Sequence, residues 1–390
     1  MQLKTLLRKE LLDVIRDKRT IISMIVVPLV AIPLLTGGFA FLMYKSEQKV
    51  KEATYKVAVD EKVNDKIVDF LSKEKLEPIK TSSTVIESLI ISKQVHAGIM
   101  FDSVSRAFVI LYDASNRRSE ESATRCEQAL MRYRETVIDS NLKEMGIRPE
   151  SIKPFDIKRI NLARPRKMFG TIFGTLIGYL IVILMFAMSS SPTVDLVTGE
   201  KERKTLEILL SSPANRMEII LAKLSAIVIV GLVSLTLYIL GYAVSMGGIL
   251  RSILPAEVYM GANINVGVSF WTVLALFFTI LPFIIFAASV EIAIASFARS
   301  YKEAQSYLSP LIIIVIFPAI AGFASIDTSV SIQQALIPIY NLTQIIKALL
   351  AGELPFGIWL LGFLANTLYA AIAVAAAFYI FNKEEILIRG

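Results

Sequence analysis

The stretch TIISMIVVPLVAIPLLTGGFAFLMY, residues 20–44, decides the fold class, because no charge interrupts it. As one helix it is long enough to cross a hydrocarbon core about 30 Å thick, so we predict a transmembrane helix here. Five later apolar blocks predict five more, at residues 168–190, 219–246, 266–297, 304–326 and 356–381. Hydrophobic residues make up 54% of the chain, against roughly 45–50% in soluble domains. The sequence therefore predicts an α-helical integral membrane protein with six transmembrane helices.

The segment before the first span, residues 1–19, has leucines at helical spacing with charges between them. Leu3, Leu7, Leu11 and Val14 fall on one face of a helix. We predict an amphipathic helix that lies in the membrane interface. A surface helix of a soluble domain is the alternative interpretation. A cleaved signal peptide is not expected, because the segment is amphipathic and contains acidic residues.

Residues 45–167 differ from the rest of the chain, because charges are interspersed with short apolar runs. Two of these runs, YKVAV at 55–59 and AFVILY at 107–112, predict β-strands. Helical patterns cover residues 65–76, 84–93 and 119–145, the last with Ser119 as its N-cap. We therefore predict an α/β domain inserted after the first span. The lone cysteine of the chain, Cys126, cannot close an internal disulfide, and His96 is the single histidine.

The distribution of basic residues predicts the orientation of the chain, because short cytoplasmic segments carry an excess of Lys and Arg. They gather in residues 1–19, in the loop 191–218 and in the tail 382–390, and Lys223, Arg299 and Lys302 lie on the same side. We assign this side to the cytoplasm of a cell membrane, with both termini cytoplasmic and the α/β domain extracellular. Three basic residues favour the opposite orientation, because they follow the first span on the predicted outer side: Lys45, Lys49 and Lys51.

Residues 327–355 are only moderately apolar and hold Pro338, Asn341, Gln344 and Lys347. Irregular backbone at membrane depth is tolerated where protein buries it. We predict short external helices or a re-entrant segment.

The segment DLVTGEKERKTLEILLSSP, residues 195–213, joins the second and third spans. It predicts a charged helix that ends in a proline turn. Glu200, Glu202, Arg203 and Lys204 are expected to form an exposed surface of mixed charge. The apolar residues that are expected to bury against the membrane domain are Leu206, Ile208, Leu209 and Leu210. A helix that is attached to two spans and exposed on the cytoplasmic side can transmit a push from a docked partner.

Within this segment, GEKERKTLE at 199–207 followed by SSP at 211–213 resembles the cytoplasmic signature of the ABC-2 type transporter permeases. The closest likeness is to their sodium-exporter branch. SYKEAQSYLSP at 300–310 is similar to the segment before that branch's fifth span, and six spans with a large domain after the first match its layout.

The resemblance implies that a cytosolic ABC ATPase subunit contacts this loop. The matching residues are Glu200, Glu202, Arg203, Thr205 and Glu207. It further implies that the chain is a permease subunit that exports sodium ions, that ATP and magnesium are bound by the partner subunit, and that a second permease copy forms a homodimer with the first.

The sequence contains no nucleotide-binding or catalytic motif of its own. The Walker A pattern G-x-x-x-x-G-K-[ST] does not occur, so ATP hydrolysis is expected from the partner. H-E-x-x-H, G-x-S-x-G and C-x-x-C are missing too, which predicts no catalytic residue, cofactor or resident metal in this chain. The net charge of +7 arises largely beside the apolar blocks, without a nucleic-acid-binding motif. We expect the bilayer and other proteins as partners, and no nucleic acid.

Glu291 lies within the fourth apolar block, where a carboxylate is costly enough to be a candidate for function. Two interpretations are open. Glu291 coordinates a transported cation, with Ser289 and Asn366 as further polar groups of a pathway, or it pairs with Arg299 near the cytosolic end of its span.

Gly170, Gly174 and Gly178 form a doubled G-x-x-x-G at the start of the second span. Such a strip allows another helix to approach closely, so it predicts a packing interface. The sequence leaves open whether the partner helix belongs to the same subunit or to a second copy.

Two other functions also fit the sequence. The first is an ABC-2 exporter of a drug, lipid, peptide or glycan. The second is a membrane-anchored receptor or scaffold whose extracellular domain binds a ligand without transport.

Overall fold

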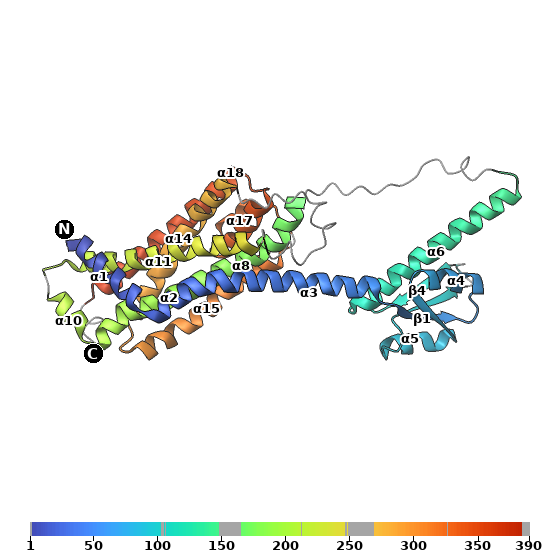
Figure 1. Cartoon of the computed structure of the whole chain (residues 1–390), viewed down its shortest axis with the longest axis horizontal. Helices are drawn as coiled ribbons and strands as arrows, with labels where there is room; N and C mark the ends of the chain where they lie inside the picture. Colours follow the sequence, from blue (N-terminus) through green and yellow to red (C-terminus); the bar gives the residue numbers. More distant parts are fainter. Residues whose placement is uncertain are drawn as a thin grey trace. The chain divides into compact units, whose positions relative to one another are not determined.

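The computed structural model describes residues 2–102, 105, 107–147, 165–211, 213–245, 248, 269–325 and 327–383. The chain divides into two compact units. One unit consists of Met1–Phe41 and Leu162–Gly390 and is a helical bundle, and the other consists of Leu42–Asn161 and contains a β-sheet (Figure 1).

Within the described residues, six helices are long and apolar enough to cross a membrane, as the sequence predicts. The first is Thr20–Glu52, built from α2 (Lys18–Val26), the π-helical turn η1 (Val27–Ala31) and α3 (Ile32–Glu52). The others are α8 (Pro165–Val194) with its extension, α11 (Arg216–Val244), α14 (Phe270–Ala295), α15 (Tyr301–Ala324) and α18 (Phe356–Phe381). Parts of the predicted segments lie outside the described residues, at 1, 103–104, 106, 148–164, 212, 246, 266–268, 326 and 384–390.

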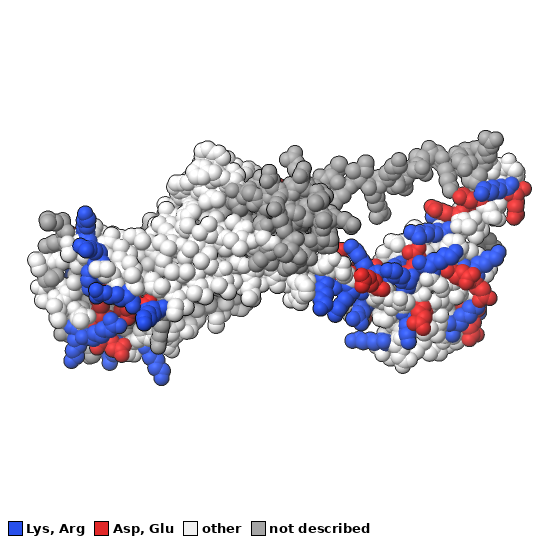
Figure 2. Space-filling view, viewed as in Figure 1, with Lys and Arg blue, Asp and Glu red and all other residues white. Residues whose placement is uncertain are grey.

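The amphipathic helix predicted at the amino terminus is α1 (Gln2–Arg16). Part of its apolar face packs on the bundle: Val14 is buried, and Leu6, Leu7 and Leu11 contact the same core, which includes residues of α11 and α18. α1 and α10 (Thr205–Leu210) lie at the same end of the bundle (Figure 1). Figure 2 shows that charged side chains gather at this end, while the described bundle surface beyond it is almost uncharged. This distribution fits a bilayer around the uncharged part.

The region predicted as external or re-entrant contains α16 (Ile332–Leu336) and α17 (Tyr340–Ala351). At 12 residues, α17 is roughly 18 Å long and too short to cross a bilayer. It is buried against α8, α15 and α18, so it is a packed part of the bundle. Its Lys347 is fully buried, and the Nζ atom donates to Ser325 O at 2.9 Å, which satisfies the ammonium group with a backbone carbonyl.

The other unit has a four-stranded sheet in the order β2-β1-β3-β4. The strands are β1 (Tyr55–Asp60), β2 (Leu76–Thr81), β3 (Ala97–Asp102) and β4 (Ala107–Tyr112). β1 pairs in parallel with β2 and β3, and β4 is antiparallel to β3, with Ile99 opposite Ile110. α4 (Asp65–Lys73) and α6 (Arg117–Glu144) cover one core, and α5 (Ser83–Ile91) covers the other.

The two predicted strands are present as β1 and β4, whereas β2 and β3 were not predicted. Pro78 and two charges break the apolar pattern of β2, an edge strand where a proline is tolerated. The predicted N-cap Ser119 is wrong, because Asn116 caps α6 by accepting from Arg118 N. Ser119 lies inside the helix, and its hydroxyl donates to the carbonyl of His96 in the segment before β3.

Candidate functional site

The charged segment between the second and third spans is mostly a continuation of the second span. α8 passes into the π-helical turn η2 (Asp195–Gly199) and then into α9 (Glu200–Glu202) with helical backbone throughout. The helix ends before Lys204, whose φ of 59° turns the chain into α10. The single charged helix that we predicted over 195–213 is therefore wrong. Because α9 continues α8, a displacement of α9 acts directly on the second span.

Hydrogen bonds attach η2 and α9 to the end of α14. Thr198 Oγ1 donates to Ala295 O at 3.0 Å, and Lys201 Nζ donates to the carbonyl of Ser296. The last carbonyls of α14 lack partners within their own helix, so these two donors satisfy them. These two hydrogen bonds hold the extension of the second span against the end of the fourth span.

Four charged side chains form an ion cluster that joins three helices: Lys9 and Glu10 of α1, Glu200 of α9 and Lys223 of α11. Lys223 Nζ donates to Glu200 Oε2 at 2.7 Å and to Glu10 Oε1 at 3.1 Å. Lys9 Nζ also donates to Glu200. Lys223 is 0% exposed and Glu200 is 7% exposed. The two ammonium groups balance the two buried carboxylates, as a buried ionic group requires, and the partly exposed carboxylate of Asp13 lies 3.6 Å from Lys9 Nζ at the edge of the cluster.

The predicted exposure of Glu200 on a docking surface is wrong, because the ion cluster encloses its carboxylate. Burial raises the pKa of Glu10, although Lys223 beside it acts in the opposite direction. Burial alone would lower the pKa of Lys9, but the carboxylates of Glu10 and Glu200 outweigh this effect and raise it. The cluster is therefore an electrostatic joint between α1, α9 and α11.

Three carboxylates, those of Glu10, Asp13 and Glu200, bring oxygen atoms within 4.8 Å of one another. Such a group can hold a metal ion when nothing else neutralises it. Here the ammonium groups of Lys9 and Lys223 lie among the carboxylates. The donor set fits an ion-pair cluster and does not fit a metal site.

Glu202, Arg203 and Thr205 keep their predicted exposure. Glu202 Oε2 accepts from the backbone N–H of Tyr301 at 2.8 Å, and Arg203 Nη2 donates to Asp195 Oδ1 at 2.9 Å. Thr205 Oγ1 donates to a backbone carbonyl of α9 at 3.2 Å. These hydrogen bonds position the three side chains, which leave charged and polar groups on the exposed surface.

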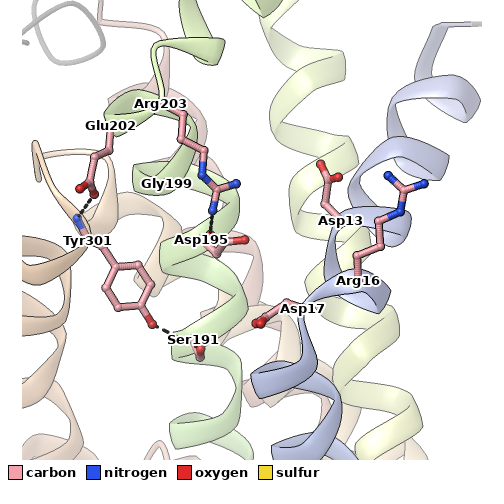
Figure 3. Close-up of a pocket in the computed structure, with 9 residues that line it drawn as sticks. All are labelled: Asp13, Arg16, Asp17, Ser191, Asp195, Gly199, Glu202, Arg203 and Tyr301. Atoms are coloured by element: carbon pink, nitrogen blue, oxygen red, sulfur yellow. Dashed lines mark hydrogen bonds and ion pairs between the residues drawn. The ribbon is translucent and has the colours of Figure 1, made fainter.

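A polar cavity of about 600 Å³ lies beside this exposed face. Figure 3 shows it between α1 and α2 on one side and the start of α15 on the other, with η2 between them. The residues that line it are Asp13, Arg16, Asp17, Ser191, Asp195, Gly199, Glu202, Arg203 and Tyr301. Charges of both signs surround a volume large enough for several side chains of another protein.

α10 carries the remaining predicted contacts. Leu206 is buried as predicted, but the predicted burial of Ile208 is wrong, because its side chain is 70% exposed. The side chain of Glu207 lies outside the described residues. Ile208 therefore adds apolar surface to the exposed face of α10.

Glu291 is 0% exposed in α14 and is bound by hydroxyl groups of α8. Ser190 Oγ donates to Glu291 Oε1 at 2.8 Å, and Thr193 Oγ1 donates to Glu291 Oε2 at 3.2 Å. The predicted pairing with Arg299 is not found. Among the described residues, no Lys or Arg nitrogen lies within 4.0 Å of this carboxylate, and Arg299 instead donates its backbone N–H to Glu303.

The structure does not bring Ser289 or Asn366 to Glu291. Ser289 Oγ donates to Ile285 O of its own helix at 2.7 Å. Asn366 Oδ1 accepts from Asn341 Nδ2 at 3.1 Å, which ties α18 to α17. Both polar groups therefore serve helix packing. The two residues that do contact Glu291 belong to the run SSSPT at 189–193, which sequence analysis passed over because it lies at the end of a span.

The glycine strip of α8 packs against α17 of the same chain. A Cβ atom on Gly170 would lie 2.4 Å from Ala351 Cα, and one on Gly174 would lie 3.2 Å from Lys347 Cα. Gly178 similarly faces the backbone of Thr343, at 3.0 Å from its carbonyl oxygen. The strip therefore accommodates the buried short helix α17 within one subunit.

Comparison with known proteins agrees with this architecture. The family model described as "ABC-2 family transporter protein" matches residues 4–386. A curated relative, "ABC transporter permease protein NatB" of Bacillus subtilis (strain 168), is 25% identical over 356 residues, which cover 88% of this chain and 89% of the relative.

Proposed function

The chain belongs to the ABC-2 transporter family, and from this premise we propose that it is the permease subunit of an exporter driven by a separate cytosolic ABC ATPase. The ion cluster is the observation that carries the proposal. It connects the extension of the second span to α1 and to the third span through Glu200 and Lys223. A force applied at this point reaches three helices at once.

The ATPase docks on the exposed face of α9 and α10 and inserts side chains into the adjoining cavity. Glu202, Arg203, Thr205 and Ile208 offer charge, a hydroxyl and apolar surface on this face. Closure of the ATPase around ATP and magnesium displaces α9, and the continuous helix transmits the displacement to α8. In this mechanism Glu200 is a positioning residue that transmits force and does not touch the ATPase.

The substrate that we propose is the sodium ion. Two observations support it: the sequence resemblance to the sodium-exporter branch, and the buried carboxylate of Glu291 with hydroxyl groups on both of its oxygens. Sodium is a hard cation, and hard cations prefer oxygen ligands. A drug, lipid, peptide or glycan is too large for a site formed by one carboxyl group and two hydroxyl groups.

We further propose that the charged end with α1 and α10 faces the cytoplasm of a cell membrane, that both termini lie there, and that the α/β unit is extracellular. The gathering of basic residues at this end supports the orientation. Two copies of the chain pair as a homodimer, because six spans supply half of the pathway in a family that works in pairs.

Co-purification with the ATPase tests the proposal. The purified chain alone is expected to hydrolyse no ATP, and the chain with its ATPase is expected to form a stable complex in detergent. Reversing the charges in E202K/R203E should abolish the complex, whereas E87K, on an exposed face of α5 in the other unit, should not. A receptor or scaffold would bring down no ATPase at all. Equal recovery of the ATPase with E202K/R203E would contradict the proposed docking face.

A further inference from the structure

The carboxyl group of Glu291 is fully buried, and no ion pair to it is found among the described residues. Its two hydrogen-bond donors, Ser190 and Thr193, are neutral hydroxyl groups. The ion cluster at the nearby end of the bundle shows the contrast, because there each carboxylate meets an ammonium group. An ionised carboxylate inside a membrane domain is expensive. Glu291 must therefore be neutralised by a bound proton or by a mobile cation.

The atoms around Glu291 are suited to a small cation. Besides the two carboxylate oxygens, the hydroxyl oxygens of Ser190 and Thr193 lie within 3.2 Å of the carboxylate. Each hydroxyl also has a backbone carbonyl within reach: Phe186 O at 3.3 Å from Ser190 Oγ, and Ser189 O at 2.7 Å from Thr193 Oγ1. A hydroxyl can turn its proton toward a carbonyl and offer a lone pair instead. The site can therefore change from donating hydrogen bonds to coordinating a cation.

A second, independent observation lies one helical turn away. A small cavity of about 10 Å³ is lined by Ser189 of α8, Ser234 of α11 and Ala287 of α14, among others. Ser234 is 1% exposed, and its hydroxyl has no hydrogen-bond partner among the described residues. A cavity of this size is close to the minimum for one water molecule. Its wall is mostly apolar, with the hydroxyl-bearing residues Ser189 and Ser234 as its polar members, and it lies next to the run that binds Glu291.

We propose that Glu291, Ser190 and Thr193 bind one small monovalent cation, which enters in exchange for a proton. In the empty state the carboxyl group holds the proton. When the cation binds, the O–H bond breaks, the proton leaves to water, and the carboxylate with the hydroxyl oxygens coordinates the cation, so the charge of the site does not change. One carboxylate balances one positive charge, which favours a monovalent over a divalent ion. The inference rests on the proposed export function and specifies its cation site.

The position of the site connects it to the ion cluster. Ser190 and Thr193 lie on α8, and the same helix continues to Glu200. The separation of ten positions between Ser190 and Glu200 corresponds to roughly 15 Å of helix. Glu291 is on α14, a different helix. Any displacement of α8 relative to α14 therefore separates the hydroxyl oxygens from the carboxylate and weakens the site.

Carbodiimide labelling tests this inference on the full chain in nanodiscs. Dicyclohexylcarbodiimide attacks protonated carboxyl groups in apolar surroundings, and mass spectrometry of the digested chain locates the adduct. We expect Glu291 to be labelled in choline chloride and protected by sodium chloride at equal ionic strength. Because one proton leaves for each cation, the sodium concentration for half protection should rise about tenfold for each unit by which pH falls.

Matched variants separate coordination from packing. S190A and T193A should each raise the sodium concentration for half protection by about tenfold, the usual scale for weakening a cation site. S289A is the control, because that hydroxyl is bound to a carbonyl of its own helix, and it should leave protection unchanged. A second readout uses thermal unfolding: sodium should stabilise the native chain and leave E291Q unaffected.

Three outcomes would overturn the inference: no labelling of Glu291 at pH 6, labelling that sodium and potassium both leave unchanged, or equal sodium stabilisation of E291Q. If these occur while the ATPase still co-purifies, the permease function stands and the cation site fails. Protection by potassium alone would support the site and contradict sodium as the substrate. Loss of ATPase binding with intact sodium protection would instead contradict the proposed docking.

Discussion

Replacing Lys223 with methionine tests the ion cluster most severely. The lysine is 0% exposed, and its Nζ atom donates to Glu200 at 2.7 Å, to Glu10 at 3.1 Å and to Leu196 O at 2.6 Å. In K223M the two buried carboxylates share the single positive charge of Lys9, which also pairs with the partly exposed Asp13. Removing one partner from a buried ion pair costs about 3–5 kcal/mol, because the remaining charge stays buried without compensation. We expect K223M to lose stability by this amount.

A second substitution is expected to restore part of the stability that K223M loses. Adding E200Q to K223M leaves Lys9 and Glu10 as a balanced pair, so the double variant should be more stable than K223M by about 1–2 kcal/mol, within the range of measured coupling energies. Lys347 supplies a matched control. It is equally buried, but its Nζ donates to a backbone carbonyl, so K347M should cost only about 1 kcal/mol.

The assay is denaturant unfolding of the full chain in mixed micelles, followed by tryptophan fluorescence. Trp359 reports on the bundle, because its indole N–H donates to Thr279 across two spans at 2.9 Å. ATP hydrolysis by the complex is measured in parallel. K223M should still co-purify with the ATPase, since the exposed face of α9 and α10 is unchanged, and should lose transport. A K223M destabilisation below about 1 kcal/mol, or a further loss on adding E200Q, would refute the reasoning.

Three other predictions concern packing and the α/β unit. G170A should destabilise the bundle by about 1–3 kcal/mol in the same unfolding assay, because its Cβ would lie 2.4 Å from Ala351 Cα, whereas G38A, with nothing within 4 Å, should be neutral. Burial raises the pKa of Cys126 to about 12, so maleimide at pH 8 should modify it only after unfolding, and rapid modification of the folded chain would contradict its burial. Burial lowers the pKa of His96 below 6.5, so the unfolded chain binds the proton more tightly. The stability of the α/β unit should therefore fall as pH drops below about 6.5, as measured by hydrogen exchange of α6, and H96Q should flatten this dependence.

Long apolar blocks were enough to predict the six spans, because the bilayer imposes both length and hydrophobicity on them. β1 and β4 were predicted because their runs are rich in β-branched and aromatic residues: YKVAV holds a single charge, Lys56, and AFVILY holds none. β2 was missed because an edge strand tolerates the proline and charges that sequence patterns associate with loops. Helix α17 was predicted only as part of an external or re-entrant segment. Its polar residues suggested exposure, but in the fold they donate hydrogen bonds to carbonyls outside their own helix.

The ion cluster could not be predicted, because it joins residues that are far apart in the chain. Glu200 pairs with a lysine 23 positions later and with one 191 positions earlier. One signal was available: Lys223 lies inside the third apolar block, where an ammonium group needs a partner. We used Lys223 only as evidence for the orientation of the chain and therefore did not predict its buried ion pair. Glu291 was identified by the same argument of cost, but its partners on α8 depend on how two spans pack.

The central claim is that the segment with α9 and α10 faces the cytoplasm and is gripped there by an ATPase. Ile208→Cys places a thiol on an exposed position outside the ion pairs, and the native Cys126 is buried and silent. A membrane-impermeant maleimide should label I208C in inside-out vesicles but not in intact cells, and bound ATPase should block the labelling. Labelling of I208C from outside intact cells would contradict the account.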